Sequence, residues 1–258
     1  MQIHTEGIVL RSFQAEDDRI LTILSRQRGI VTAYASGASR PKRQLAGATE
    51  LLCHSHFMLF YNRGRYSVDK AESVRIFFGI RNSIEHLALG AYFAQLAGEL
   101  SPGEEPAEDC FDLLLGCLHY LENQKRPLAM LKPLYELRSL TLAGYMPDLV
   151  ACRDCGCYQA DSMYFSLASS DLLCPACKNS AERRMALPPG VLAAMRHILY
   201  APLRRVFSFT LPAEGLQQLQ RVSELYIKHQ LEKTLPTLEY YNRLSGDAPA
   251  VPDTIHLE

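Results

Sequence analysis

Four regularly spaced cysteines are the residues of this chain best suited to chemistry. Cys152 and Cys155 are separated by two residues, as are Cys174 and Cys177, and eighteen residues lie between the two pairs. Each Cys-x-x-Cys pair places two thiolates on one side of an ion, and two such pairs complete a tetrahedral zinc site with Zn–S distances of about 2.3 Å. Because four thiolates leave no position for a reactive water, the spacing predicts one structural zinc ion.

A redox role for the same cysteines is the alternative interpretation. A thioredoxin-like motif needs a strand before Cys-x-x-Cys and a helix after it, whereas Gly156 and the stretch 178–180 that follow the two pairs are typical of turns. Zinc is therefore favoured over redox or disulfide use. Cys157 is an additional cysteine beside the first pair, and the sequence alone leaves open whether it substitutes as a ligand.

Composition limits the remaining function classes. The chain has 258 residues, a hydrophobic fraction of 48% and a net charge of −1, which favours two or three modules and no global attraction to polyanions. Residues 1–80 carry eleven Lys/Arg against seven Asp/Glu, and the other 178 carry sixteen against twenty-one. There is no signal-peptide pattern and no apolar run of the ~18 residues that a membrane span needs. We expect a cytoplasmic protein that binds any polyanion through its N-terminal part.

The hydrophobic pattern changes from strands to helices along the chain. Residues up to about 72 predict five short strands, at 7–11, 19–24, 30–35, 51–61 and 66–69, and closure into a small OB-like barrel removes their exposed edges. From residue 84 the period is helical, with helices expected within 84–92, 111–118, 127–145, 191–200 and 213–231. The expected fold is α+β, with an all-helical body after the barrel. Its predicted divisions are the barrel (1–80), the two parts of the helical body (81–150 and 181–245), the zinc hairpin inserted between them (151–180) and a flexible tail (246–258).

The basic clusters of the barrel are the candidate DNA-binding residues. They occupy the loop before the fourth strand and the hairpin turn after it, and they are Arg40, Lys42, Arg43, Arg63 and Arg65. Arg and Lys in such loops reach phosphate oxygens, although a solvated loop explains the composition equally well. Tyr34 or Tyr66 would offer a ring for base stacking. His54 and His56 alternate along the fourth strand, and two solvent-facing histidines are favoured there over a metal pair.

The order of these modules resembles that of the RecO family of bacterial DNA-repair proteins. The resemblance covers nearly the whole chain and rests on the paired Cys-x-x-Cys knuckles and on the segments Gly7–Arg11, Arg19–Ser25, Gly29–Ala38, Arg40–Lys42 and Thr234–Tyr241. It implies a non-enzymatic, DNA-binding adaptor of recombinational repair that binds single- and double-stranded DNA, promotes strand annealing and supports recombinase loading. The partners that it implies are RecR and the C-terminal tail of single-stranded DNA-binding protein. Two departures are the acidic cluster Glu16–Asp18 and a less basic loop.

The resemblance also implies a pocket for an acidic, apolar-ended peptide on the helical body. The candidate residues are basic ones near apolar helix stripes, namely Lys132, Arg138, Arg196, Arg204 and Arg205. Two other function classes remain as alternatives. One is a zinc-containing interaction scaffold that does not bind DNA. The other is a nucleobase deaminase built from His4, Glu6 and the second knuckle, which is disfavoured because such enzymes leave one zinc position to water.

Overall fold

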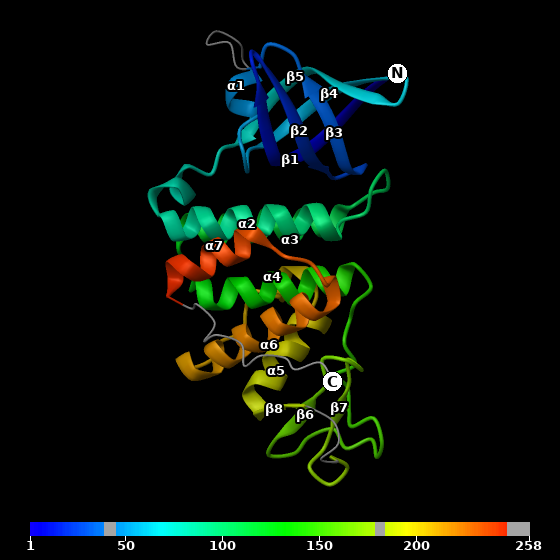
Figure 1. Cartoon of the computed structure of the whole chain (residues 1–258), viewed down its shortest axis with the longest axis vertical. Helices are drawn as coiled ribbons and strands as arrows, with labels where there is room; N and C mark the ends of the chain where they lie inside the picture. Colours follow the sequence, from blue (N-terminus) through cyan, green and yellow to red (C-terminus); the bar gives the residue numbers. More distant parts are fainter. Residues whose placement is uncertain (39–44, 179–183, 247–258) are drawn as a thin grey trace, which may run out of the picture.

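The molecule is a stack of three parts, with a barrel at one end and a cysteine-bearing hairpin at the other (Figure 1). This computed structural model describes residues 1–38, 45–178 and 184–246. The helical body lies between the two ends, and its helix α2 (Ile84–Leu100) runs directly beneath the barrel. The predicted α+β architecture, with an N-terminal barrel and a helical body that carries the inserted hairpin, is confirmed.

Five strands close the barrel in the order β1-β2-β3-β5-β4. Neighbouring strands are antiparallel, except that β3 and β5 pair in parallel. The strands are β1 (Gln2–Ala15), β2 (Asp18–Ser25), β3 (Gly29–Ala35), β4 (His54–Asn62) and β5 (Arg65–Arg75). Their inward side chains form a separate apolar core that includes Val9, Leu21, Ile23, Val31 and Phe57. The short helix α1 (Leu45–Ala48) contributes Leu45 and Ala48 to this core. The barrel is thus closed around its own interior, and closure leaves its strands without exposed edges.

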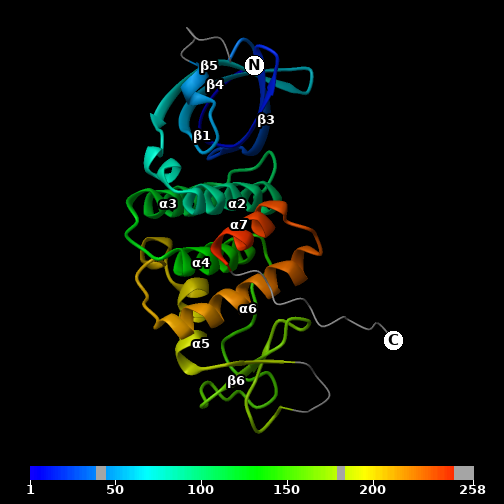
Figure 2. The same ribbon diagram turned by 60° about the vertical axis from the view of Figure 1, so that its left-hand side comes forward.

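Helices stacked in layers make up the body (Figure 2). After the 3₁₀ turn η1 (Phe78–Asn82) and α2 come α3 (Glu108–Asn123), α4 (Leu128–Leu142), α5 (Pro189–Tyr200), the 3₁₀ turn η2 (Leu203–Arg205), α6 (Ala213–Leu231) and α7 (Pro236–Ser245). Helix α4 lies within the range 127–145 in which a helix was expected, and it contains Pro133. Helix α7, which the periodicity did not reveal, packs against α2 and brings the C-terminal part of the body back towards the barrel (Figure 2).

A three-stranded sheet forms the hairpin at the far end of the stack. Its strands β6 (Met163–Phe165), β7 (Leu172–Leu173) and β8 (Met185–Leu187) pair in the order β7-β6-β8. Phe165 and Leu172 are buried in the same core cluster as the body helices. The Phe165 ring packs edge to face against the Tyr226 ring of α6, with ring centroids 5.4 Å apart. The hairpin is therefore part of the body's packing.

Polar groups join the barrel to the body. Arg26 donates to Glu6 of β1 at 2.9 Å and to Asp112 of α3 at 2.6 Å, and its guanidinium lies 4.3 Å from the centre of the Phe111 ring. His54 pairs with Glu6 at 2.7 Å and is buried, so the prediction of two solvent-facing histidines is wrong for His54 and holds only for His56. Burial lowers the pKa of the His54 imidazole despite the neighbouring carboxylate. This chain of side chains orients the barrel on α3.

Gly29 is where the turn between β2 and β3 touches the body, and its replacement by alanine should weaken that junction. Gly29 has φ of +60°, and an added Cβ would lie 2.0 Å from the carbonyl oxygen of Pro102 and 2.8 Å from that of Glu105. Left-handed backbone alone costs an alanine about 1–2 kcal/mol, and the clash with a rigid backbone adds to it. Gly29→Ala should therefore lower the unfolding free energy in denaturant titrations by about 2 kcal/mol or more.

Gly64→Ala is the matched control for this substitution. Gly64 also has a positive φ, +80°, but nothing lies within 4 Å of its added Cβ. It carries only the conformational cost, so it should destabilise the protein less than Gly29→Ala. Equal losses for the two variants would contradict the proposed role of the Gly29 contact in seating the barrel on the body.

Candidate metal centre and nucleic-acid interface

The four predicted cysteines meet at one point of the hairpin. Their sulfur atoms all lie within 4.8 Å of one another, and the Sγ atoms of Cys155 and Cys174 are 3.6 Å apart. Four sulfurs at about 2.3 Å from one ion in a tetrahedron are separated by about 3.8 Å. The cluster therefore has the donor set and the size for a metal ion, as the spacing of the cysteines predicted.

Local backbone hydrogen bonds shape each knuckle. In the first, Gly156 N donates to Cys152 O at 2.9 Å, and Gly156 has φ of +72°. In the second, Cys177 N donates to Cys174 O at 3.2 Å. Arg153 N donates to Leu172 O at 2.8 Å and so ties the first knuckle to β7, directly before the second. Hydrogen bonds within the segment that separates the two pairs, which contains β6 and β7, therefore bring the pairs together.

The environment of Cys152 favours the thiolate that a metal ion requires. Burial opposes ionisation, but hydrogen bonds with the backbone of Cys174, Cys155 and Asp154 outweigh it and lower the pKa of the Cys152 thiol to about 6. Cys157 is not a member of the cluster, and its Sγ instead donates to Gln159 O at 3.3 Å.

An ion pair network closes the hairpin beside the cysteines. Asp171 accepts from Arg153 at 2.8 Å and from Arg184 at 2.8 Å, so it links the first knuckle to the chain that leads into β8. Burial would raise the pKa of Asp171, but the hydrogen bonds from Arg184, Ser169 and Arg153 lower it. Sequence analysis did not single out Asp171, because its partners lie 13 and 18 residues away along the chain.

Of the predicted DNA-binding residues, Arg63 and Arg65 lie on the turn between β4 and β5. Arg63 has φ of +48° and Gly64 φ of +80°, and Asn62 pairs with Arg65, which is the two-residue hairpin turn with left-handed central residues. Both arginines are exposed. Arg40, Lys42 and Arg43 lie outside the described residues, and their role stays a prediction.

Six of the described arginines on the barrel fall into two groups, and Arg28, which is half-buried and has no ion pair with a described residue, belongs to neither. Three of them are paired with carboxylates: Arg19 with Glu50, Arg26 with Glu6 and Asp112, and Arg75 with Glu122. In contrast, Arg11, Arg63 and Arg65 are exposed and make no ion pair within the part of the chain that the structure describes; we call these three the outer arginines. Their charge is available to an anionic ligand.

Tyr34 and Tyr66, the two candidate stacking residues, point to opposite sides of the barrel wall. Tyr66 packs against the barrel core, with its ring centre 4.8 Å from that of Tyr61. Tyr34 is exposed and donates its hydroxyl hydrogen to Asp18. Of the two rings, only that of Tyr34 is open to a ligand.

Two of the five predicted partner-binding residues, Lys132 and Arg138, are engaged inside the protein. The Lys132 side chain is 2% exposed and lies between Glu136 and Glu224. Arg138 donates to the carbonyl oxygens of Ile198 and Leu199 at the end of α5. These contacts leave neither side chain free to face a partner.

The other three residues of that set lie nearer the surface. Arg196 donates to the carbonyl oxygens of Leu149, Val150 and Tyr158 at 2.7–2.9 Å, so it fastens the chain before and after the first knuckle to α5. Arg204 and Arg205, on η2, are exposed. The pocket expected on the helical body would have to use these last two.

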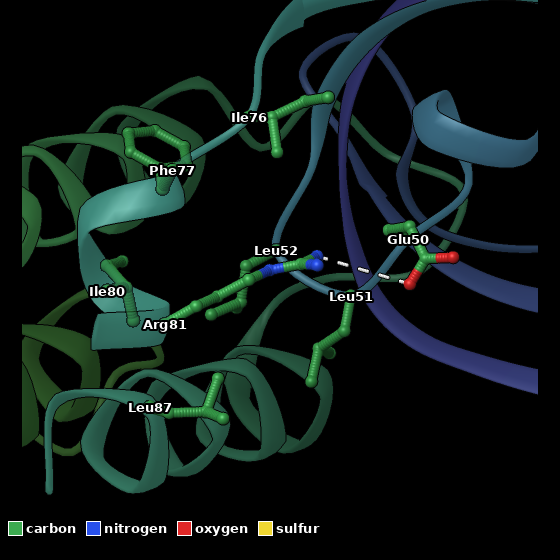
Figure 3. A pocket seen from close by; sticks show the side chains of 8 residues that line it. All are labelled: Glu50, Leu51, Leu52, Ile76, Phe77, Ile80, Arg81 and Leu87. Atoms are coloured by element: carbon green, nitrogen blue, oxygen red, sulfur yellow. Dashed lines mark ion pairs between the residues drawn. The ribbon is translucent and has the colours of Figure 1, made fainter. Parts of the chain in front are cut away.

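A pocket of about 270 Å³ lies at the junction between the barrel and the body (Figure 3). Figure 3 shows the Arg81 side chain reaching across it towards Glu50, with an N–O distance of 4.0 Å. Its walls come from the chain before β4, from η1 and from α2, and they are lined by Glu50, Leu51, Leu52, Ile76, Phe77, Ile80, Arg81 and Leu87. The pocket is apolar except for this one charge pair.

The deaminase alternative does not fit the geometry. His4 and Glu6 lie on β1 of the barrel, at the opposite end of the molecule from the cysteine cluster (Figure 1). Glu6 is held by His54 and Arg26.

No helix among the described residues is long and apolar enough to cross a membrane.

A closed barrel, a helical body and a four-cysteine hairpin together define a class of modular α+β proteins with a candidate metal site. Comparison with known proteins makes this class specific. The model of the RecO N-terminal domain ("Recombination protein O N terminal") matches residues 1–77, and that of the C-terminal domain ("Recombination protein O C terminal") matches residues 81–239. The chain belongs to the RecO family of DNA-repair and recombination proteins, which are not enzymes.

Proteins that this chain matches over nearly their whole length are named DNA repair protein RecO. The chain is 32% identical to the DNA repair protein RecO of Acetivibrio thermocellus over 243 residues, which is 94% of this chain and 97% of that protein. It is 31% identical to the DNA repair protein RecO of Symbiobacterium thermophilum, with 93% and 97% covered. It is also 31% identical to that of Pelotomaculum thermopropionicum, with 95% of both chains covered.

Proposed function

We propose that this protein is a DNA-binding adaptor of bacterial recombinational repair, which binds single- and double-stranded DNA through its barrel, promotes strand annealing and supports recombinase loading. The observation that carries the proposal is the division of the barrel arginines. The three outer arginines are exposed and form no ion pair with the described residues, whereas Arg19, Arg26 and Arg75 form ion pairs with carboxylates. Unpaired arginines on an exposed turn and strand suit phosphate contacts, which are independent of sequence.

The cysteine cluster supports one structural zinc ion, held by Cys152, Cys155, Cys174 and Cys177. Zinc prefers four thiolates in a tetrahedron, and such a site adds folding free energy but no reactive position. Its role in this chain would be to hold β6, β7 and the first knuckle in one unit against α6. DNA binding stays with the barrel in this proposal.

Partner proteins would bind the helical body. By family membership we infer that RecR and the acidic C-terminal tail of single-stranded DNA-binding protein are partners in the cytoplasm, at sites of repair. Arg204 and Arg205 are the two residues of the predicted set with exposed side chains, so they are the candidates to meet an acidic peptide. Exposed charges of this kind raise the association rate and set orientation.

Replacing Arg63 and Arg65 together by alanine should weaken DNA binding several-fold. Each neutralised phosphate contributes about 0.7 to the log–log salt slope for single strands and about 0.9 for duplex. The double variant should therefore reduce that slope by about 1.4 with single strands, measured by fluorescence anisotropy between 50 and 200 mM salt. The melting temperature should hardly change because both side chains are exposed.

The matched control is Arg204→Ala with Arg205→Ala, which removes the same charge from the body. It should leave the DNA salt slope unchanged and weaken binding of an acidic peptide instead. An unchanged slope in the Arg63/Arg65 variant would place the DNA elsewhere. Absence of DNA binding by the unmodified protein would favour the alternative, an interaction scaffold that does not bind DNA.

A further inference from the structure

An exposed row of apolar side chains crosses the outer wall of the barrel. Phe13 of β1 pairs directly with Ile20 of β2, and Ile20 pairs directly with Tyr34 of β3. Their exposed fractions are 56%, 41% and 44%. Single exposed apolar residues are ordinary, but directly opposite residues on neighbouring strands project from the same face, about 5 Å apart. These three form one continuous strip, which we call the stacking row.

The row exists because β1 contains a bulge. The register of β1 against β2 shifts between Val9 and Arg11. Val9 points into the barrel core, so regular alternation would send Arg11 and Phe13 inward as well. The extra residue of the bulge inverts the alternation, and Arg11 and Phe13 point to solvent instead.

A row of polar and cationic side chains runs parallel to the stacking row. Arg11 pairs with Thr22, and Thr22 pairs with Thr32, each two residues from the corresponding member of the stacking row. The parallel register that joins Ala33 to Tyr66 brings Arg65 beside Thr32. With strands about 4.8 Å apart, the positions of Arg11 and Arg65 are about 14 Å apart measured along the curved barrel wall, at the two ends of this cationic row.

Carboxylates lie on the other side of the stacking row. Glu16 and Asp17 occupy the turn between β1 and β2, beyond Phe13 and Ile20. Asp18 accepts the hydroxyl hydrogen of Tyr34, which fixes the orientation of the ring. The surface therefore has a direction, with cations along one edge, apolar groups in the middle and carboxylates along the other edge.

We propose that the stacking row holds the unpaired bases of a single-stranded nucleic acid, while its phosphates follow the cationic row from Arg11 to Arg65. This inference rests on the proposed DNA binding and assigns its single-strand component to Phe13, Ile20 and Tyr34. The surface selects this ligand because a polyanion is drawn to the exposed arginines, and only unpaired bases present a free ring face to the row. Duplex DNA keeps its bases stacked inside and is left with the arginines alone.

The test compares three probes of equal length: an oligothymidylate, an abasic strand that has phosphates but no bases, and a blunt duplex. Phe13→Ala with Tyr34→Ala should weaken binding of oligothymidylate about tenfold or more, because stacking contributes about 1–3 kcal/mol per base. Binding of the abasic strand and the duplex should stay within about twofold. Phe78→Ala, which removes another exposed phenylalanine on η1, is the matched control and should change none of the three affinities.

Two further variants separate stacking from folding. Tyr34→Phe keeps the ring and loses the bond to Asp18, so it should retain most of the affinity for oligothymidylate. Phe13→Leu keeps apolar bulk without a ring and should lose affinity with an unchanged melting temperature. If Phe13→Ala with Tyr34→Ala binds oligothymidylate as tightly as the unmodified protein does, the stacking row is not a base-binding surface. The same conclusion follows if this variant loses affinity for all three probes equally. If the unmodified protein binds none of the probes, the proposed DNA binding itself fails.

Discussion

Serine at Cys174 is expected to abolish the proposed zinc binding and to unfold the hairpin. Cys174 is buried and its sulfur belongs to the cluster in which all four Sγ atoms lie within 4.8 Å. Loss of one thiolate leaves three crowded thiolates with a weakened or absent ion. Metal binding contributes on the order of 10 kcal/mol to the folding of isolated zinc fingers. We therefore expect the unfolding free energy to fall by more than about 4 kcal/mol.

The loss should extend into the body because the hairpin shares its core. Cys152, Phe165 and Leu172 belong to the same buried cluster as Ile227 of α6. Zinc content by elemental mass spectrometry and thermal unfolding by circular dichroism measure the two effects on the same samples. DNA binding by the barrel should persist wherever the barrel remains folded, since its core is a separate cluster.

Cys157→Ser is the matched control, because Cys157 lies two residues after Cys155 and outside the cluster. It should keep one zinc ion per chain and the unmodified melting temperature. One zinc ion per chain in the Cys174 variant, or none in the freshly purified unmodified protein, would contradict the assignment of the site.

Replacing Lys132 by methionine is expected to destabilise the helical body by about 3–5 kcal/mol, the usual cost of leaving a buried charge without its partner. Lys132 Nζ lies 3.0 Å from Glu136 and 2.7 Å from Glu224. The Glu136 side chain is fully buried and also accepts hydrogen bonds from the hydroxyls of Tyr92 and Ser223. Methionine fills the space but leaves the Glu136 carboxylate without a cation.

The loss of unfolding free energy caused by Lys132→Met should depend on pH. Burial raises the pKa of Glu136 even in the presence of Lys132, and loss of the lysine raises it further. A carboxyl group whose pKa is raised in the folded state is neutral in both the folded and the unfolded protein when the pH is below its unfolded-state pKa, so it does not reduce stability there. As the pH rises above the unfolded-state pKa, the free energy of unfolding falls. The destabilisation by Lys132→Met should therefore be larger at pH 8 than at pH 5 in denaturant titrations.

Two variants give this prediction its controls. Lys132→Met combined with Glu136→Gln removes both charges and should recover part of the lost stability, because an absent pair costs less than a broken one. Lys228→Ala removes a 40% exposed lysine from the same carboxylate, Glu224, and should cost under about 1 kcal/mol. If Lys132→Met costs no more than Lys228→Ala, the buried pair does not have the role assigned to it.

Features that depend on neighbouring residues were predictable from the sequence. The cysteine spacing predicted the composition of the cluster because each knuckle is closed by backbone bonds within a few residues, such as Gly156 N to Cys152 O. The helix predicted over residues 213–231 has those bounds in the structure, since its apolar stripe repeats with the helical period. Asn62–Arg65 was predicted as a hairpin turn from its own residues.

Contacts between distant segments were not predictable in this way. Lys132, Arg138 and Arg196 have the composition of a basic surface in the sequence, but their partners lie 92, 60 and 47 residues away. Whether a cation faces solvent or a buried carboxylate depends on which helices pack together. The partner-binding candidates were therefore chosen by charge alone, and only Arg204 and Arg205 have the exposure that the prediction assumed.

By itself, the sequence determined the barrel, the helical body and the four cysteines that can hold a metal ion, because strand alternation, helical period and knuckle spacing are all local. Tertiary structure alone decided which charges and rings are free to bind. The bulge after Val9 turned Arg11 and Phe13 outward, against the alternation of their strand, and strand pairing then aligned Phe13 with Ile20 and Tyr34. Such an alignment arises from hydrogen bonds between strands, and no pattern within one strand records it.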